Sequence, residues 1–208
     1  MYGLALEGGG AKGAYHIGAY KALRELDIKI GAITGASIGA LNGAILTQGD
    51  FDIAYDLWRK ELKISKLFDF DEEKINEIKS GKLHKDSIPY FINVSKELFS
   101  NKGLDTARIK KLLNDIIDED KIRNSEIDFG IVTVSLLDMK PLELYKEDIP
   151  EGKLIDYLMA SANFPAFKID KMDGKVFIDG GIHDNLPINL LIKKGYKDII
   201  AIRTYGLG

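Results

Sequence analysis

The amino-acid sequence predicts an α/β protein built on a parallel sheet. Over residues 2–48, apolar runs typical of buried strands alternate with helical segments, in the order strand, loop, helix, strand, turn, helix. Strand-like runs return over residues 129–203, again interrupted by helical segments. Consecutive strands separated by helices pair in parallel, because the helix carries the chain back across the sheet. The length of 208 residues fits one domain with a small insertion.

Each element is predicted from its own apolar pattern. The strand at 2–7 is a short apolar run that ends in glycines, and the first helix, which ends near Leu26, has an apolar stripe beside charged residues. The other expected strands are 30–34, 129–135, 142–145, 176–178 and 199–203, and the other expected helices are 38–48, 154–162 and 187–194.

The middle of the chain, about 51–125, is helical in pattern, richer in lysine and interleaved with aromatic residues. We favour amphipathic helices that pack on the sheet. The alternative is a mobile cap that presents apolar surface to a lipid.

Composition excludes several classes of function. A net charge of −3 and a pI near 5.7 provide no basic surface for nucleic acid. The absence of cysteine excludes a disulfide scaffold, a thiolate metal site and a cysteine nucleophile. The three histidines, His16, His84 and His183, are too scattered to suggest a zinc site, so no metal is expected. His16 is expected to be structural and His84 to lie on the surface.

The N-terminus does not resemble a secretory signal, because the apolar run before Glu7 is short and no basic region precedes it. The uncharged stretch 30–49 carries a glycine at every fourth position, as in transmembrane dimerisation stripes, but it is too weakly apolar to span a bilayer. A buried strand, a tight turn and a buried helix are expected there instead. The expected location is the cytoplasm, with signal-independent export as the alternative.

The pentapeptide Gly35-Ala36-Ser37-Ile38-Gly39 is the first candidate for chemistry. The pattern G-x-S-x-G places a serine on a sharp strand-to-helix turn, where the backbone is strained and the positions two residues away must be small. Such a turn exposes the Ser37 hydroxyl at a helix N-terminus, whose partial positive charge favours an alkoxide. The alternative is a serine that only caps the helix.

The glycine-rich loop at 8–13 is the second candidate. Its exposed N–H groups can bind a phosphate or a developing oxyanion. The loop matches the dinucleotide pattern G-x-G-x-x-G, but Thr34 stands where a ribose-binding acid is expected, and no Lys-Ser/Thr pair follows the last glycine. A serine at the end of the neighbouring strand favours an oxyanion hole. Lys12 either adds positive charge near this loop or extends into solvent.

The third candidate is Asp179-Gly180-Gly181, an acid at a strand end followed by two glycines. Asp-Gly is a common turn, so this segment alone indicates a turn. Together with Ser37, Asp179 becomes a candidate general base that bonds the serine hydroxyl directly. Such a base needs a pKa above the free value of about 3.9, which burial in an apolar pocket supplies.

These three motifs, in this order, resemble the patatin-like phospholipase family. The resemblance extends to residues 160–165, Ala-Ser-Ala-Asn-Phe-Pro, and 184–187, Asp-Asn-Leu-Pro. It implies a three-layer α/β/α fold with a mostly parallel central sheet. It also implies lipid acyl hydrolysis by a Ser–Asp dyad without a catalytic histidine, calcium or another cofactor. Residues 1–208 would form one catalytic domain with a variable, cap-like insertion at about 51–125.

The resemblance also implies a role for each matched residue. Ser37 would be the nucleophile and Asp179 the general base and proton acceptor. The backbone of Gly8, Gly9 and Gly10 would form the oxyanion hole, with the Ile38 backbone as a further donor. The remaining motif positions are Lys12, Gly13, Gly35, Gly39, Gly180 and Gly181. Glu7, directly before the glycines, departs modestly from the family pattern.

Three other interpretations stay open. The chain order also permits an α/β-hydrolase triad of Ser37, an acid and His183. A module that binds a dinucleotide or phosphate through the loop at 8–13, without hydrolase activity, is a second alternative. A lipid-binding protein with a vestigial site is a third. The expected partner is a lipid or acyl-ester substrate, with transient contact to a membrane surface; no nucleic acid is expected, and the sequence indicates no oligomeric state.

Overall fold

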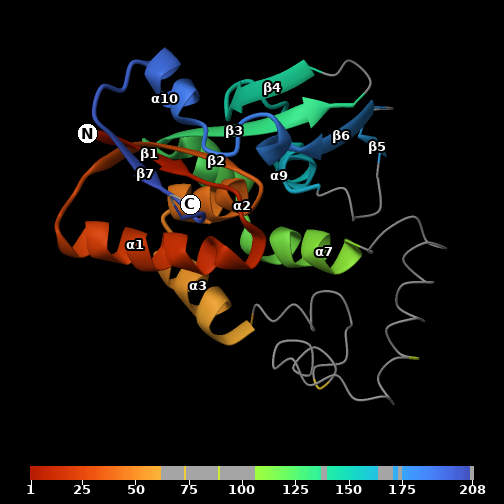
Figure 1. Ribbon diagram of the computed structural model, residues 1–208, viewed down its shortest axis with the longest axis horizontal. Helices are drawn as coiled ribbons and strands as arrows, with labels where there is room; N and C mark the ends of the chain where they lie inside the picture. Colours follow the sequence, from red (N-terminus) through yellow and green to blue (C-terminus); the bar gives the residue numbers. More distant parts are fainter. Residues whose placement is uncertain are drawn as a thin grey trace.

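The computed structural model of the chain describes residues 1–61, 73, 89, 106–136, 140–163, 171–172 and 175–206. In these residues, a central sheet has helices on both faces (Figure 1). The strands are β1 (Tyr2–Leu6), β2 (Ile30–Ala36), β3 (Asp128–Ser135), β4 (Lys140–Tyr145), β5 (Lys171–Met172), β6 (Lys175–Asp179) and β7 (Ile199–Ile202). The α-helices are α1 (Ala14–Glu25), α2 (Ile38–Thr47), α3 (Phe51–Asp56), α7 (Ala107–Ile116), α8 (Glu119–Asn124), α9 (Leu154–Ser161) and α10 (Ile188–Lys194). The short turns are the 3₁₀ helices η1 (Gly10–Gly13) and η4 (Gly180–Ile182) and the π-helical turn η2 (Leu57–Glu61).

The sheet combines a parallel centre with antiparallel strands at one side. Strands β7, β1, β2 and β3 lie side by side and run parallel, which confirms the predicted α/β class. Strands β4 and β6 both pair with β3 in the antiparallel direction, and β5 pairs with β6. The carboxyl ends of the four parallel strands therefore meet at one edge of the sheet, where α/β proteins place their ligands.

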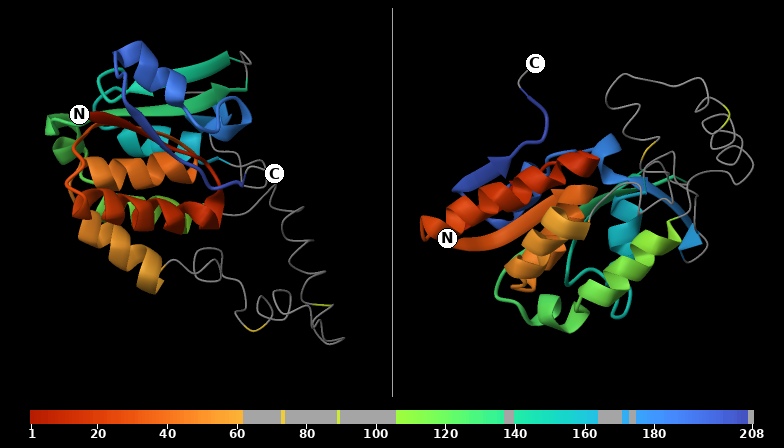
Figure 2. Two further views of the ribbon diagram at one scale, coloured as in Figure 1. Left: turned by 60° about the vertical axis from the view of Figure 1, so that its left-hand side comes forward. Right: turned by 90° about the horizontal axis from the view of Figure 1, so that it is seen from below.

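Helices cover the two faces unequally. Helix α10 lies on one face, and helices α2 and α9 pack on the other, with α1, α3 and α7 outside them (Figure 2). The side chains of β1 alternate accordingly, because successive residues of a strand point to opposite faces. Leu4 and Leu6 belong to the large core under α2, whereas Ala5 packs against Leu191 of α10.

The predicted elements lie close to the observed ones. Strand β2 is two residues longer than expected, and the short strand β5 was not predicted. The uncharged stretch 30–49 is the buried strand β2, a turn and helix α2, as expected. Within the part of the chain that the structure describes, no helix is long and apolar enough to cross a membrane. Most of the predicted helical middle, and His84, lie outside the described residues.

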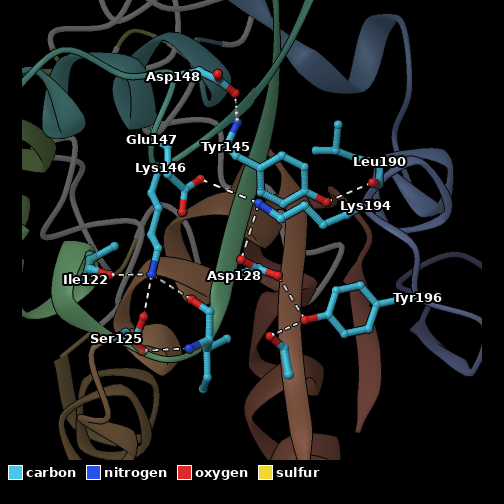
Figure 3. A network of polar contacts seen from close by, with 12 residues as sticks. Ile122, Ser125, Asp128, Tyr145, Lys146, Glu147, Asp148, Leu190, Lys194 and Tyr196 are labelled. Atoms are coloured by element: carbon cyan, nitrogen blue, oxygen red, sulfur yellow. Dashed lines mark hydrogen bonds and ion pairs between the residues drawn. The ribbon is translucent and has the colours of Figure 1, made fainter.

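A polar network fastens the amino ends of β2 and β3 to helices α8 and α10, at the edge opposite the carboxyl ends (Figure 3). The Tyr196 hydroxyl lies within hydrogen-bond distance of two acceptors, the carbonyl of Gly31 at 2.7 Å and the Asp128 carboxylate at 2.9 Å. Burial and the acceptor Asp128 raise the pKa of Tyr196 to about 12. The buried Lys146 ammonium donates to the carbonyls of Ile122, Ser125 and Ile127. These contacts lie at the amino ends of the strands, away from their carboxyl ends.

Candidate active site

Ser37 lies on the sharp turn between β2 and α2. Its backbone angles are φ 54° and ψ −126°, which confirms the strained geometry expected from G-x-S-x-G. A Cβ on Gly35 would lie 2.3 Å from the carbonyl of Gly39, and one on Gly39 would lie 2.3 Å from the carbonyl of Leu6. The two flanking glycines therefore let the turn fold back on itself and on β1. The Ser37 side chain makes no capping bond to α2, so the capping interpretation is wrong.

The register of β3 explains how Asp179 reaches Ser37. Strand β2 pairs with β3 up to Val132, which lies opposite Ala36, and the antiparallel β6 pairs with the next residue, Thr133, through Asp179. Strand β4 occupies the other edge of β3 over the same residues, so β2 and β6 share one edge and meet end to end. Two residues 142 positions apart in the sequence thereby become neighbours.

The Asp179 carboxyl group accepts a hydrogen bond from the Gly181 N–H at 2.7 Å, and the Ser37 hydroxyl lies beside it as a further donor. Asp179 is only 6% exposed. Burial raises the pKa of Asp179, and these two donors, which favour the carboxylate, oppose this rise without cancelling it. A buried carboxylate in direct contact with a serine hydroxyl has the position and the raised basicity of a proton acceptor.

Ser161, which is fully buried, fixes the turn from the other side. Its Oγ accepts the N–H of Ser37 at 3.2 Å and donates to the carbonyl of Val132 at 2.6 Å. The bridge connects the end of α9, the turn and strand β3. Ser161 belongs to the segment 160–165, whose last two residues lie outside the described part of the chain. Its neighbour Asn163 donates to the carbonyl of Phe177 in β6 at 2.7 Å, so this segment supports both sides of the Ser37–Asp179 pair.

The glycine loop follows β1 and passes directly beside this pair. Gly10 has φ 56°, a left-handed conformation that glycine adopts without steric cost. In the described part of the chain, the N–H groups of Gly9 and Gly10 donate to no protein acceptor. Ile38 is the first residue of α2, so its N–H also lacks a helical acceptor. Residues with unpaired backbone donors therefore line the same pocket as Ser37.

A buried network holds the base of the glycine loop on α2. The Asn42 side chain donates to the carbonyl of Gly13 at 2.9 Å, lies 3.2 Å from Nδ1 of His16 and accepts the indole N–H of Trp58 at 2.8 Å. Burial lowers the pKa of His16 to about 4, so its ring stays neutral at physiological pH. Lys12 lies in the same loop with its Nζ 3.6 Å from the centre of the Tyr205 ring, an arrangement that favours a cation–π interaction.

A pocket of about 660 Å³ opens at Ser37. Gly9, Gly10 and Asp179 line it near the serine, and apolar side chains of α2, η2, α7 and α9 line its depth. Its apolar members include Leu41, Ile45, Leu57, Ile109, Leu113 and Met159. The pocket therefore combines a few convergent polar groups with apolar walls, as sites for small apolar ligands do.

Neither of the two described histidines lines the pocket. His183 is exposed and follows η4, and it is not among the residues that line the pocket, which counts against a triad. His16 is buried beneath the glycine loop, as the structural role predicted for it requires. Among the described residues, no group of three or more histidines, aspartates or glutamates is arranged to hold a metal ion.

Comparisons with known proteins agree with this architecture. The structure of VipD from Legionella pneumophila superposes with a TM-score of 0.57 at 20% identity, over 89% of this chain and 47% of that one. The shared fold places the chain in the class of α/β proteins with a central, mostly parallel sheet. A model of the patatin-like phospholipase family matches residues 4–192. The chain therefore belongs to the patatin-like phospholipase family, a family of lipid acyl hydrolases.

Curated relatives include much longer proteins. Neuropathy target esterase of Drosophila melanogaster is 28% identical over 203 residues, which are 96% of this chain and 12% of that protein. A patatin-like phospholipase domain-containing protein of Caenorhabditis elegans is 23% identical over 96% of this chain and 13% of its own length. The chain thus spans about an eighth of the length of these relatives.

Several residues of the site carry no strong signal in the sequence. Ser161 and Asn185 lie in segments that the family resemblance covers, but the pattern alone assigns neither a contact. Trp58 and Tyr205 line the pocket from parts of the chain that have no motif. A half-buried aromatic residue such as Trp58 and an exposed one such as Tyr205 are common in any globular protein, so only the fold reveals their place.

Proposed function

We propose that this chain is a serine lipid acyl hydrolase, of the phospholipase A, lysophospholipase or esterase type. It cleaves fatty-acyl esters through a Ser37–Asp179 dyad. The observation that carries the proposal is the position of the Ser37 hydroxyl as a donor beside the buried Asp179 carboxyl group, at an apolar pocket that Gly9 and Gly10 also line. In this proposal residues 1–208 form one catalytic domain, and the segment at about 51–125 is a cap-like insertion.

Acylation begins when the Ser37 oxygen attacks the carbonyl carbon of the ester and Asp179 accepts the hydroxyl proton. The negative charge that develops on the carbonyl oxygen is stabilised by the N–H groups of Gly9 and Gly10 in the glycine loop and of Ile38. The free N–H groups of Gly9 and Gly10 support this role, whereas the N–H of Gly8 already donates to the carbonyl of Asn185 at 2.9 Å. The tetrahedral adduct then collapses, the ester C–O bond breaks, and Asp179 returns the proton to the leaving alcohol.

Deacylation uses the same groups in reverse. Asp179 removes a proton from a water molecule, which attacks the acyl carbon of the serine ester. The second tetrahedral adduct collapses to the fatty acid, and the proton passes from Asp179 to the Ser37 oxygen. One carboxylate thereby serves both half-reactions, and the steps require no histidine.

The shape of the pocket supports a fatty-acyl substrate. Ile38, Leu41, Asn42 and Ile45 of α2 line it at a spacing of three and four residues, so one helix face forms a wall. This wall extends for about 10 Å from Ser37, given a rise of about 1.5 Å per residue. Ile182 and Tyr205 line the same pocket and are 57% and 49% exposed, so the entrance itself is apolar. We propose that this entrance contacts the lipid surface during substrate uptake.

The first test is incubation with a long-chain fluorophosphonate, followed by intact-mass measurement and identification of the modified peptide. A single adduct on Ser37 is expected. Ser37→Ala should abolish both the adduct and ester hydrolysis, and Asp179→Asn, which keeps the size of the side chain, should lower turnover by about 100-fold or more. His183→Ala is the matched control near the site, and it should retain activity.

Near-normal hydrolysis by Asp179→Asn would refute the dyad, and loss of activity in His183→Ala would favour the triad. If the folded protein gave no adduct and hydrolysed no ester but bound a nucleotide, the loop at 8–13 would be a binding module. Binding of lipid without either reaction would indicate a vestigial site.

A further inference from the structure

The segment that follows β7, residues 203–205, is attached to the glycine loop by a buried acid. The Glu7 carboxylate, at the end of β1, accepts the N–H of Thr204 at 2.6 Å and the N–H of Tyr205 at 3.0 Å. Glu7 is only 6% exposed. Hydrogen bonds to an ionised acceptor are stronger than neutral ones, so Glu7 holds Thr204 firmly beside the loop.

The Thr204 side chain in turn acts on the loop itself. Its hydroxyl donates to the carbonyl of Gly8 at 2.6 Å. It also packs against the next residue, because a Cβ on Gly9 would lie 2.3 Å from the Thr204 oxygen. The Asn185 amide approaches the same Gly8 carbonyl at 3.4 Å. The Gly8 carbonyl is therefore held on one side of the loop, with the Thr204 hydroxyl as its shortest contact.

The orientation of this carbonyl determines the orientation of the next donor. The Gly8–Gly9 peptide bond is trans, so the Gly8 carbonyl and the Gly9 N–H point in opposite directions across a rigid plane. A carbonyl fixed on Thr204 directs the Gly9 N–H away from Thr204. In the described part of the chain this N–H has no protein acceptor, and Gly9 lines the pocket together with Ser37.

We infer that Thr204 is a positioning residue of the hydrolase. Glu7 holds the backbone of Thr204, and the Thr204 hydroxyl orients the Gly8–Gly9 peptide. The Gly9 N–H then faces the carbonyl oxygen of the substrate, which becomes the oxyanion when Ser37 attacks the carbonyl carbon. The inference depends on the proposed function. The segment after the last strand thereby becomes part of the reaction site, although it carries no motif.

The matched pair Thr204→Val and Thr204→Ser tests this role. Valine keeps the shape of threonine but removes the donor, whereas serine keeps the donor. On a soluble ester, Thr204→Val should lower kcat by about 10- to 100-fold, somewhat less than loss of an oxyanion-hole donor, with KM changed less than about twofold. Thr204→Ser should restore kcat to within about threefold of the wild type.

A second readout separates positioning from stability. A trifluoromethyl ketone, which forms an oxyanion on Ser37, should bind Thr204→Val more weakly by the same factor as the fall in kcat/KM, while a non-hydrolysable ether analogue of the substrate should bind both proteins equally. Glu7→Gln, which keeps one acceptor for the Thr204 N–H, should show the same pattern with a smaller loss. It replaces Thr204→Val if that variant does not fold.

Equal kcat in Thr204→Val and the wild type would overturn the inference and leave the proposed hydrolase intact. Equal loss of ketone and ether binding would also overturn it, because a general change in pocket shape affects both ligands. A wild-type protein that neither reacts with the fluorophosphonate nor hydrolyses any ester would overturn the proposed function, and this inference with it.

Discussion

Glycine in place of Ser37 should stabilise the protein relative to alanine, although glycine normally destabilises a folded backbone. Ser37 has φ 54° and ψ −126°, outside the regions that residues with a Cβ adopt readily. Both substitutions remove the hydroxyl and its interaction with the Asp179 carboxyl group. The difference between the two variants therefore isolates the backbone strain at this turn.

The magnitude follows from two opposing contributions. Relief of a strained backbone conformation is worth about 1–3 kcal/mol. The greater freedom of glycine in the unfolded chain costs about 0.4–1 kcal/mol. We therefore expect Ser37→Gly to exceed Ser37→Ala in unfolding free energy by about 1–2 kcal/mol. At Ala22, an exposed position inside helix α1, the same Ala-to-Gly change should instead destabilise by about 1 kcal/mol.

Urea denaturation followed by circular dichroism measures both differences, provided that the m-values of the variants agree. The sign decides the result. If Ser37→Gly were less stable than Ser37→Ala, by an amount similar to that found for Ala22→Gly, the turn would store no strain. The proposed nucleophile would then not be held in a costly backbone conformation.

Three further predictions concern protons and the acyl chain. Burial lowers the pKa of His16 from 6.5 to about 4, so the unfolded chain takes up a proton at a higher pH than the folded protein does. The protein should therefore lose about 2 kcal/mol of unfolding free energy as the pH falls from 7.5 to 5. His16→Gln should flatten that slope in urea titrations. Because Asp179 must be ionised to accept a proton and burial raises its pKa, the acid limb of kcat/KM should lie above pH 3.8, and a limb at or below that value would contradict the assignment. Ile45→Trp, at the depth of the pocket, should shift the preference from dodecanoyl to butanoyl esters by about tenfold or more in kcat/KM, and an unchanged ratio would show that the chain binds elsewhere.

The fold was predictable where the sequence pattern is local. Apolar runs bounded by glycine mark β1 and β2, and the pentapeptide around Ser37 specifies a turn whose geometry the structure confirms. Glycine is required there because the backbone packs closely on itself: the positions of Gly35 and Gly39 leave no space for a Cβ. Every strand-to-helix turn of this geometry has the same backbone contacts, so a short sequence motif predicts them. The family assignment rests on the same motifs and is confirmed over residues 4–192.

Contacts across the molecule were not predictable from local pattern. The bonds of Thr204 to Glu7 and Gly8 join residues almost 200 positions apart, and they depend on the pairing of β1 with β7. Ser161 acts through one hydroxyl that bridges the Ser37 turn and β3, and a serine is equally common in a solvent-exposed helix end. The roles of the individual site residues stay predictions until the variants are measured.

The direction of β6 explains why the proposed chemistry needs no histidine. Because β6 runs antiparallel to β3, its last residue, Asp179, lies opposite Thr133 of β3. The last residue of β2, Ala36, lies opposite the preceding residue of β3, Val132. A parallel β6 over the same residues would place its last residue opposite Ser135, about 7 Å farther along the edge. That separation is too large for a carboxylate to bond a serine hydroxyl directly, and a third side chain would have to carry the proton. Strand direction thus places Asp179 beside Ser37, and Gly180, which has no space for a Cβ beside the carbonyl of Val132, lets the chain turn away immediately afterwards.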